Sequence, residues 1–235
     1  MMTAEIKIYN QDNRESLKFV GENSIDLIYA DYIYENLDFS WAEKYWSCLK
    51  EGGIFIAQTD WHSDAEFHVF MKYEMKATLV NKLSWKCEWG NHPKDRFHQC
   101  YDDILIYSNV KSGWKFRSER IQVKKATTTK GLNPSGRITK TATAWIDDIV
   151  LTTTAKERVK KKDGHLVRWQ KPLRLYDRII APFSDEGDMI VDPFMGSGSL
   201  GLWCKMNNRN YIGIEYDKEV FELARENIFG SISGS

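Results

Sequence analysis

The chain has 235 residues, 42% of them hydrophobic, which is enough for one α/β domain with an insertion or for two small domains. No apolar run approaches the roughly 18 residues of a membrane span, and the first residues lack the apolar segment of a signal peptide. Four cysteines without paired spacing favour a reducing compartment over a disulfide framework. We therefore expect a cytoplasmic protein with no membrane partner.

The net charge of zero conceals a strong asymmetry along the chain. Positions 111–171 hold 16 basic and 5 acidic residues, a net charge of +11, so the rest of the chain carries −11. A basic segment on an acidic body favours a polyanionic partner such as a nucleic acid for that segment alone. A solvated Lys- and Thr-rich loop is the alternative.

The N-terminal part alternates between the periods of strands and helices. We expect a strand over 6–10, one or two helical turns over 16–20, a strand buried on both faces over 24–30, a helix over 39–49 that ends at 50–53, a strand over 54–58, a helix over 64–75, and strands over 80–85 and 103–109.

The hydrophobic periodicity is lost in the middle of the chain and resumes in the C-terminal part. Positions 123–131 and 134–143 are polar, basic and without period, so we expect them to be mobile when no partner is bound. The C-terminal part predicts a helix over 173–180, a strand over 189–191, a helix over 198–206, a strand over 211–214 and a helix over 218–227. Strands alternating with helices at both ends of the chain indicate a mostly parallel sheet with helices on both faces.

The most informative motif is Val191-Asp192-Pro193-Phe194-Met195-Gly196-Ser197-Gly198, between a predicted strand and a predicted helix. Glycines there allow a tight turn and a close approach of a ligand to the backbone. Glu215 ends the next strand, where a carboxylate can bind both hydroxyls of a ribose. Loop and acid together predict a pocket for an adenosine-containing cofactor, and a purely structural glycine turn is the alternative.

A dehydrogenase fits this loop poorly. Only 34 residues follow Gly201, too few for the rest of a nucleotide-binding sheet, so the remaining strands must come from the N-terminus. Ligands of open α/β sheets bind at the carboxyl ends of strands, where the strand order reverses. Asp31 follows a predicted parallel strand, so we expect Asp31 and Gly196 to share one cleft.

These residues resemble the DNA amino-methyltransferases that use S-adenosylmethionine, in the permuted order called the beta class. Asp192-Pro-Phe-Met-Gly-Ser-Gly matches the family's Asp-Pro-Phe-x-Gly-x-Gly loop, and Tyr211-Ile-Gly-Ile-Glu215-Tyr-Asp217 matches its second acidic strand. Gln170-Lys171-Pro172 resembles the segment that leads into the cofactor half, and positions 8–12 resemble the opening strand. The resemblance covers nearly the whole chain.

The resemblance implies a circularly permuted, Rossmann-like methyltransferase fold with a mostly parallel seven-stranded sheet and a small basic target-recognition insert. It divides the chain into a catalytic half (1–110), the insert (111–168), a cofactor half (169–230) and a disordered tail (231–235). The implied cofactor is S-adenosylmethionine and the implied partner is double-stranded DNA, and a homodimer is allowed. No metal site is expected.

Residue roles follow from the matched positions and from the basic insert. The expected catalytic residues are Asp31, Tyr32 and Tyr34. The expected cofactor-binding residues are Asp12, Asp31, Lys171, Asp192, Pro193, Phe194, Gly196, Ser197, Gly198, Glu215, Tyr216 and Asp217. The expected nucleic-acid-binding residues are Arg117, Lys124, Lys125, Asn133, Arg137, Lys140, Lys160, Lys161 and Arg168.

The catalytic motif departs from the family pattern Asp-Pro-Pro-Tyr, because the chain reads Asp31-Tyr32-Ile33-Tyr34. An exocyclic amine becomes nucleophilic when two acceptors bind its hydrogens. The Asp31 carboxylate and the Tyr32 carbonyl can be these acceptors, and packing must stiffen the loop in place of proline. Tyr34 can stack on a base flipped out of the duplex.

We expect methylation of adenine N6 rather than cytosine N4, because an Asp opening the motif is commoner in the adenine enzymes by family resemblance. A homologue that binds nucleic acid without turnover is the rival, and methylation of RNA or of a protein side chain is a third reading. The spacing of Cys87, His92, His98 and Cys100 is not that of a usual zinc site. Asp60-Trp61-His62 could line the target-base side of the cleft or cap the next helix.

Overall fold

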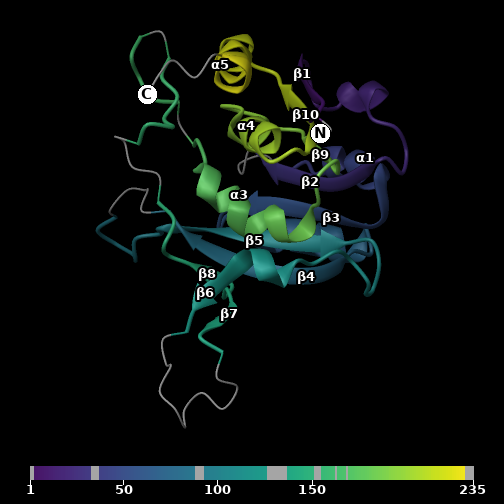
Figure 1. Ribbon diagram of the computed structural model, residues 1–235, viewed down its shortest axis with the longest axis vertical. Coiled ribbons are helices and arrows are strands. Elements are labelled where there is room, and N and C mark those ends of the chain that lie inside the picture. Colours follow the sequence, from purple (N-terminus) through teal and green to yellow (C-terminus); the bar gives the residue numbers. More distant parts are fainter. Residues whose placement is uncertain are drawn as a thin grey trace.

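The computed structural model describes residues 3–32, 37–87, 93–125, 137–150, 155–161, 163–167 and 169–230, except the side chain of Leu17. The main sheet of these residues is shown in Figure 1. Its strands follow the order β1 (Ile6–Asn10), β10 (Asn210–Glu215), β9 (Met189–Asp192), β2 (Ile25–Asp31), β3 (Leu49–Thr59), β5 (Tyr101–Ser108), β4 (Thr78–Lys86) and β8 (Trp145–Ile146).

The sheet is mostly parallel, as the sequence predicted. Only β5 runs against its neighbours, β3 and β4. Seven strands correspond to the seven expected ones, and β8 is a two-residue addition from the basic segment that pairs with β4 at Ser84 and Trp145. A two-residue strand shows no alternation, so the sequence contains no signal for it.

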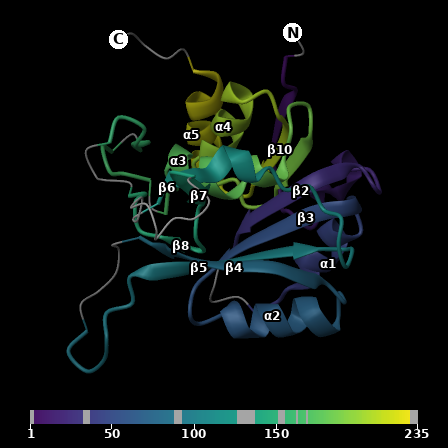
Figure 2. The same ribbon diagram turned by 60° about the horizontal axis from the view of Figure 1, so that its bottom comes forward.

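Helices cover both faces of the sheet. Figure 2 shows α3 (Leu173–Ile179), α4 (Ser199–Met206) and α5 (Lys218–Phe229) on one side and α2 (Asp64–Tyr73) on the other. The core on the side of α2 also contains α1 (Ser40–Trp46). Short 3-10 helices span Ser16–Phe19, Ser118–Ile121 and Ala181–Phe183.

One predicted boundary was wrong. Positions 50–53 were expected to end the first helix, but they lie inside β3, and the helix ends at Trp46. The backbone of Leu49 pairs with Ile25, so parallel pairing with β2 begins earlier than the polar residues indicate. Gly52 has a φ of +75° there, a conformation that glycine adopts readily.

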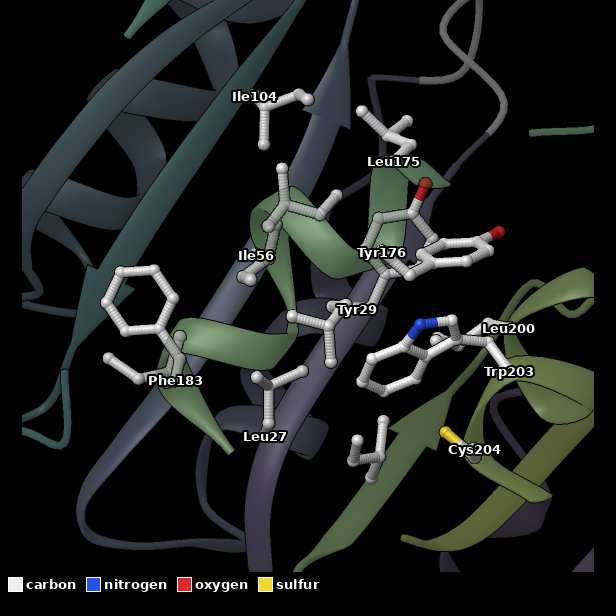
Figure 3. Close-up of a cluster of buried hydrophobic side chains, with 14 of the residues drawn as sticks. Leu27, Tyr29, Ile56, Ile104, Leu175, Tyr176, Phe183, Leu200, Trp203 and Cys204 are labelled. Atoms are coloured by element: carbon white, nitrogen blue, oxygen red, sulfur yellow. The ribbon is translucent and has the colours of Figure 1, made fainter. Parts of the chain in front are cut away.

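The core beneath α3 and α4 is drawn in Figure 3. Leu27 and Tyr29 project from β2 into it, and the rings of Tyr29 and Tyr176 meet edge to face at 5.6 Å. The indole Nε1 of Trp203 donates to Asp177 at 2.7 Å, which joins α4 to α3. These contacts fix α3, and the residues that precede it, against the end of β2.

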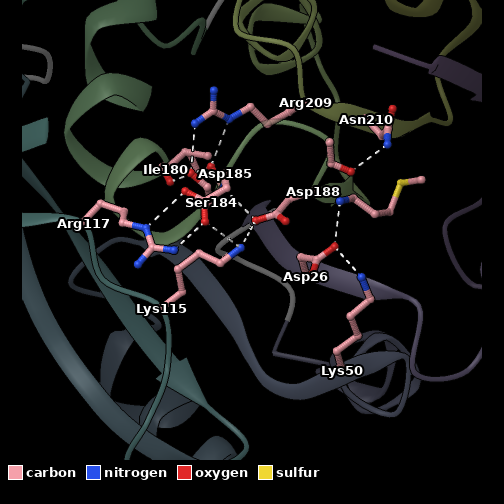
Figure 4. Close-up of polar contacts among 12 residues, drawn as sticks. Asp26, Lys50, Lys115, Arg117, Ile180, Ser184, Asp185, Asp188, Arg209 and Asn210 are labelled. Carbon is pink, nitrogen blue, oxygen red and sulfur yellow. Dashed lines mark hydrogen bonds and ion pairs between the residues drawn. The ribbon is translucent and has the colours of Figure 1, made fainter. Parts of the chain in front are cut away.

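The basic segment is bound to the cofactor half through ion pairs, drawn in Figure 4. The Arg117 guanidinium donates twice to Asp185, at 3.2 and 2.7 Å, and Arg120 donates to the same carboxylate at 2.7 Å. These donors hold the pKa of Asp185 well below its usual range. Lys115 pairs with Asp188 beside them.

The basic segment contains two strands that its sequence did not predict. β6 (Gln122–Lys124) and β7 (Thr139–Thr141) form an antiparallel hairpin in which Val123 pairs with Lys140. Its two strands lie close to β8 in Figure 1 and Figure 2. Positions 126–136, part of the stretch expected to be mobile, lie outside the described residues, as does the tail.

Gly201 tests how closely α4 packs on its neighbours. A β-carbon at this position would lie 2.6 Å from Ile228 Cδ1 and 2.8 Å from Tyr211 Cε1. We expect Gly201→Ala to lower the free energy of unfolding by about 1–3 kcal/mol through overpacking. Urea denaturation measures the change. Gly21→Ala is the control, because its nearest neighbour would be Ser24 Oγ at 3.6 Å, and equal losses in the two variants would contradict the packing argument.

Candidate cofactor and catalytic site

The carboxyl ends of four neighbouring parallel strands meet at one edge of the sheet. Asn10 of β1 pairs with Glu215 of β10, and Gly213 of β10 pairs with Asp192 of β9. β2 lies on the other side of β9 in the same direction and ends at Asp31. The predicted catalytic acid and the glycine loop therefore leave the sheet at the same edge.

The glycine loop has the conformation that its residues allow. Gly196 and Gly198 have φ values of +53° and +75°, in the left-handed region that favours glycine. The loop is held by the Met195 amide, which donates to Ile214 O at 2.8 Å, and by Asn227 Nδ2, which donates to Ser197 O at 2.9 Å. The Ser197 hydroxyl lies 3.0 Å from the Ser199 hydroxyl.

Glu215 is bound to the glycine loop. Its Oε2 accepts from the Gly196 amide and its Oε1 from the Asp217 amide, both at 2.9 Å. Burial raises the pKa of this carboxyl, while the amide donors oppose the shift. The Asn10 side chain donates to the carbonyls of Glu215 and Tyr216 and fixes the strand end.

The loop and Glu215 fit an adenosine-containing cofactor. A β-carbon at Gly196 would meet no atom nearer than Phe194 O at 3.9 Å, so the loop faces open space there. Beside that space lies a carboxylate of the kind that binds ribose hydroxyls. Tyr216 is 78% exposed next to Glu215, and Phe194 packs edge to face on Trp41 at 4.8 Å.

Asp192 supports the loop from inside the protein. Its side chain is buried, its Oδ1 accepts from the Phe194 amide at 3.1 Å, and its Oδ2 accepts from Tyr211 Oη at 3.2 Å. Burial raises the pKa of Asp192 to about 8, and the charges of Asp31 and Glu215 add to the shift. Asp192 therefore acts on the shape of the loop.

Asp31 is held by a lysine from the segment before α3. Lys171 Nζ lies 2.5 Å from Asp31 Oδ2 and donates to Trp169 O at 3.0 Å. Trp169 has a φ of +61°, which is uncommon for a residue with a side chain, and is 74% exposed. Pro172 follows in an extended conformation and opens α3. The Gln170-Lys171-Pro172 segment thus reaches Asp31, the predicted catalytic acid.

Tyr32 is an anchor of the chain after Asp31. Its ring is 3% exposed and lies 5.2 Å from Phe67, 5.7 Å from Trp41 and 5.9 Å from Phe39. Its hydroxyl lies 2.9 Å from Ser63 Oγ. Tyr32 and Asp31 point to opposite faces of the sheet, as consecutive strand residues do.

The other residues predicted to bind the cofactor or nucleic acid lie in several parts of the structure. Asp12 follows β1 at the same edge, where its Oδ1 accepts from Arg14 N, and Asp217 caps α5 by accepting from Val220 N. Lys124 and Lys140 belong to the strands of the hairpin, and Lys125 and Arg137 lie on its loop side. Lys160 and Lys161 belong to the segment 155–161, and Arg117 to the ion pairs with Asp185. Tyr34, Asn133 and Arg168 lie outside the described residues.

Sequence reasoning missed part of the site. Tyr29, Gln58 and Asp102 form a hydrogen-bonded row beside Asp31, and no motif includes them. The signal available was polar residues at strand ends, which a strand-by-strand reading of the carboxyl edge would have found. Asp60, one of the suggested caps, binds the His62 ring at 2.6 Å, and α2 has no side-chain cap.

No group of three or more potential metal ligands occurs among the residues that the structure describes. His92, one of the four Cys and His residues considered from the sequence, lies outside them. In the same part of the chain, no helix is both long and apolar enough to cross a membrane.

The fold and this edge define a Rossmann-like α/β protein with a nucleotide-type cofactor loop. The family described as DNA methylase, the N6/N4 methyltransferases, matches residues 5–226. The chain therefore belongs to the N6/N4 DNA methylase family, as its motifs predicted. The predicted cofactor, S-adenosylmethionine, is the one on which this family of methyltransferases depends.

Individual relatives agree with this membership. The chain is 28% identical to the type II methyltransferase M.HpaI of Haemophilus parainfluenzae over 94% of this chain and 73% of that protein. The crystal structure of the M1.HpyAVI–SAM complex matches with a TM-score of 0.66 and 25% identity over 94% of this chain and 98% of the other. The PvuII cytosine-N4-specific methyltransferase shares the fold, with a TM-score of 0.76 and 16% identity over 100% and 89% of the chains.

The raised pKa of Asp192 makes stability depend on pH. The folded protein keeps a proton up to about pH 8, whereas the unfolded chain loses it near 3.8. This contribution is complete below the unfolded value and is lost as pH rises towards the folded value. Asp192→Asn has no proton to lose, so we expect its Tm relative to the wild type to rise from pH 5 to pH 8. A constant difference across this range would show that Asp192 is ionised in the fold.

Proposed function

We propose that this protein transfers a methyl group from S-adenosylmethionine to the exocyclic amine of a base in double-stranded DNA, with adenine N6 as the favoured target. The observation that carries the proposal is the meeting of Asp31, held by Lys171, with the glycine loop and Glu215 at one edge of the sheet. Asp31 supplies a hydrogen-bond acceptor for the amine, and the glycine loop with Glu215 supplies the cofactor pocket.

The chemistry begins with a poor nucleophile, because the lone pair of the amine is delocalised into the base. The Asp31 carboxylate accepts one hydrogen of the amine and the Tyr32 carbonyl accepts the other, so the nitrogen becomes tetrahedral and its lone pair is freed. When bound, S-adenosylmethionine supplies a methyl group activated by its sulfonium. The Asp31 carboxylate also stabilises the positive charge that develops on the nitrogen.

The loss of both prolines from the motif is compatible with this geometry. A misplacement of about 1 Å in a reacting group can cost on the order of a hundredfold in rate, so the acceptors need a rigid support. The aromatic rings around Tyr32 and its contact with Ser63 provide that support by packing. These contacts favour an active enzyme over a homologue that binds nucleic acid without turnover.

DNA binding is assigned to the basic segment. The exposed side chains of Lys124, Arg137 and Lys140 lie in or beside the strands of the hairpin and would contact phosphates, which position a protein on DNA without specifying sequence. A base inside the duplex cannot reach Asp31, so the target base must leave the stack, and Tyr34 would stack on it.

The first experiment identifies the product. We expect the protein, incubated with unmethylated duplex DNA and labelled S-adenosylmethionine, to yield labelled N6-methyladenine after digestion to nucleosides. Asp31→Ala should abolish the label. Asp26→Ala is the matched control, because Asp26 lies on the same strand at its other end, where it binds Lys50 and the Met189 amide.

Each of the other possible results supports one of the alternative functions. Labelled N4-methylcytosine would keep the mechanism and overturn the choice of base. Cofactor binding without label on diverse DNA would support the inactive homologue, and label on RNA or peptide in competition with DNA would change the substrate. Loss of label in both variants would show that Asp31→Ala acts through folding.

The role of the hairpin is tested by salt dependence. We expect Lys140→Gln to weaken DNA binding for all sequences alike and to reduce the slope of log affinity against log salt by about 1, as loss of one phosphate contact does. Fluorescence anisotropy at several salt concentrations measures the slope. Lys44→Gln, an exposed lysine of α1, is the control. An unchanged slope for Lys140→Gln would show that Lys140 does not contact a DNA phosphate.

A further inference from the structure

A row of hydrogen-bonded side chains crosses the carboxyl edge of the sheet beneath α3. The buried Tyr29 hydroxyl donates to Gln58 Oε1 at 2.7 Å, and Gln58 Nε2 donates to Asp102 Oδ2 at 2.7 Å. The row links three neighbouring strands, β2, β3 and β5. The amide of Gln58 is therefore oriented by both neighbours, and it fixes the Asp102 carboxyl.

The register of the strands places this row beside Asp31. Asp31 pairs directly with Gln58, and the next residue of β3, Thr59, pairs with Asp103. Alternation along each strand directs Asp31, Gln58 and Asp102 to the face covered by α3. Asp103 points to the opposite face, where it binds Ser84 and Lys82.

The pKa of the Asp102 carboxyl depends on burial and on charged groups from the neighbouring strands and from the segment before α3. Burial is the largest influence on its carboxyl and raises its pKa to about 6, whereas the Lys171 ammonium opposes this shift. The carboxylates of Asp31 and Asp60 raise the pKa further. Cys87 Sγ at the end of β4 lies 3.9 Å from Asp102 Oδ1, and no stronger donor contacts this oxygen among the described residues.

The proposed reaction leaves a proton that needs an acceptor. Asp31 is engaged by the Lys171 ammonium at 2.5 Å and is needed to bind the amine, so it is a poor base. Asp102 has one oxygen fixed by Gln58 and the other without a strong donor in the described part of the chain. We propose that Asp102 is the proton acceptor of the methyl transfer, an inference that rests on the proposed function.

The step balances as follows. The lone pair of the amine nitrogen forms the N–C bond to the methyl group, while the C–S bond breaks and its electron pair neutralises the sulfonium. The nitrogen is left with one proton too many. That proton leaves along its hydrogen bond to the Asp31 carboxylate as the nitrogen lone pair is restored, and Asp31 passes it on to the neighbouring Asp102 carboxylate. Asp102 returns it to solvent after the product leaves. No oxidant, reductant or further reactant is needed.

The test is the pH dependence of single-turnover methylation. We expect the wild-type rate to rise about tenfold per pH unit below about pH 6 and to level off above it, because only the carboxylate accepts a proton. Asp102→Asn should lose this rise and be at least about tenfold slower at pH 8, with DNA affinity within about twofold. Asp102→Glu should restore the rise in part.

Asp103→Asn is the matched control, because it removes the neighbouring carboxyl on the other face of the sheet. It should keep the wild-type pH profile even if it lowers stability through Lys82 and Ser84. A wild-type pH profile in Asp102→Asn would overturn the proposal while leaving the methyltransferase function intact.

A second readout does not depend on turnover. Carboxyl 13C NMR of the protein alone should show a resonance that titrates near pH 6 and is missing from the spectrum of Asp102→Asn. If this resonance titrated near pH 4 instead, Asp102 would be an ordinary surface acid and the proposal would fail. A wild type with the expected titration but no methylation of any nucleic acid would overturn both this inference and the proposed function.

Discussion

The site depends on one parallel pairing between segments that are far apart in the chain. Leu27 of β2 pairs with Ile190 of β9, and Ile28 pairs with Val191. Parallel strands end at the same edge, so this pairing brings Asp31, the predicted catalytic acid, from the N-terminal half to the glycine loop of the C-terminal half. The core of Leu27, Tyr29 and the residues of α3 and α4 stabilises the pairing from one face.

The basic segment lies between two parts of the fold that the sheet joins directly. It follows β5, contributes β8 to the edge of the sheet and leads into α3, and the parts of the fold that it connects are already joined by β2 and β9. Arg117 and Arg120 bind it to Asp185 near the end of the sheet opposite the catalytic edge.

The chemistry of the edge is dominated by acids. Asp31, Asp102, Asp192 and Glu215 lie close enough to influence one another, and Lys171 is the cation that the structure places among them in the described residues. Burial raises the pKa values of Asp102, Asp192 and Glu215, and the charge of Asp31 raises those of Asp102 and Asp192 further. The acids differ in their hydrogen-bond donors, since Asp31 binds Lys171, Asp102 binds Gln58 and Glu215 binds the Gly196 amide.

Local pattern was sufficient for the strands that form the sheet, for the glycine loop with Glu215, and for the position of Asp31 at a strand end. Each of these follows from hydrophobic period or from a contiguous motif. The start of β3, the two-residue β8 and the β6–β7 hairpin were decided by backbone pairing between distant residues, which no local pattern encodes. The Tyr29–Gln58–Asp102 row was also decided by the tertiary structure, because the register between strands determines which polar side chains become neighbours.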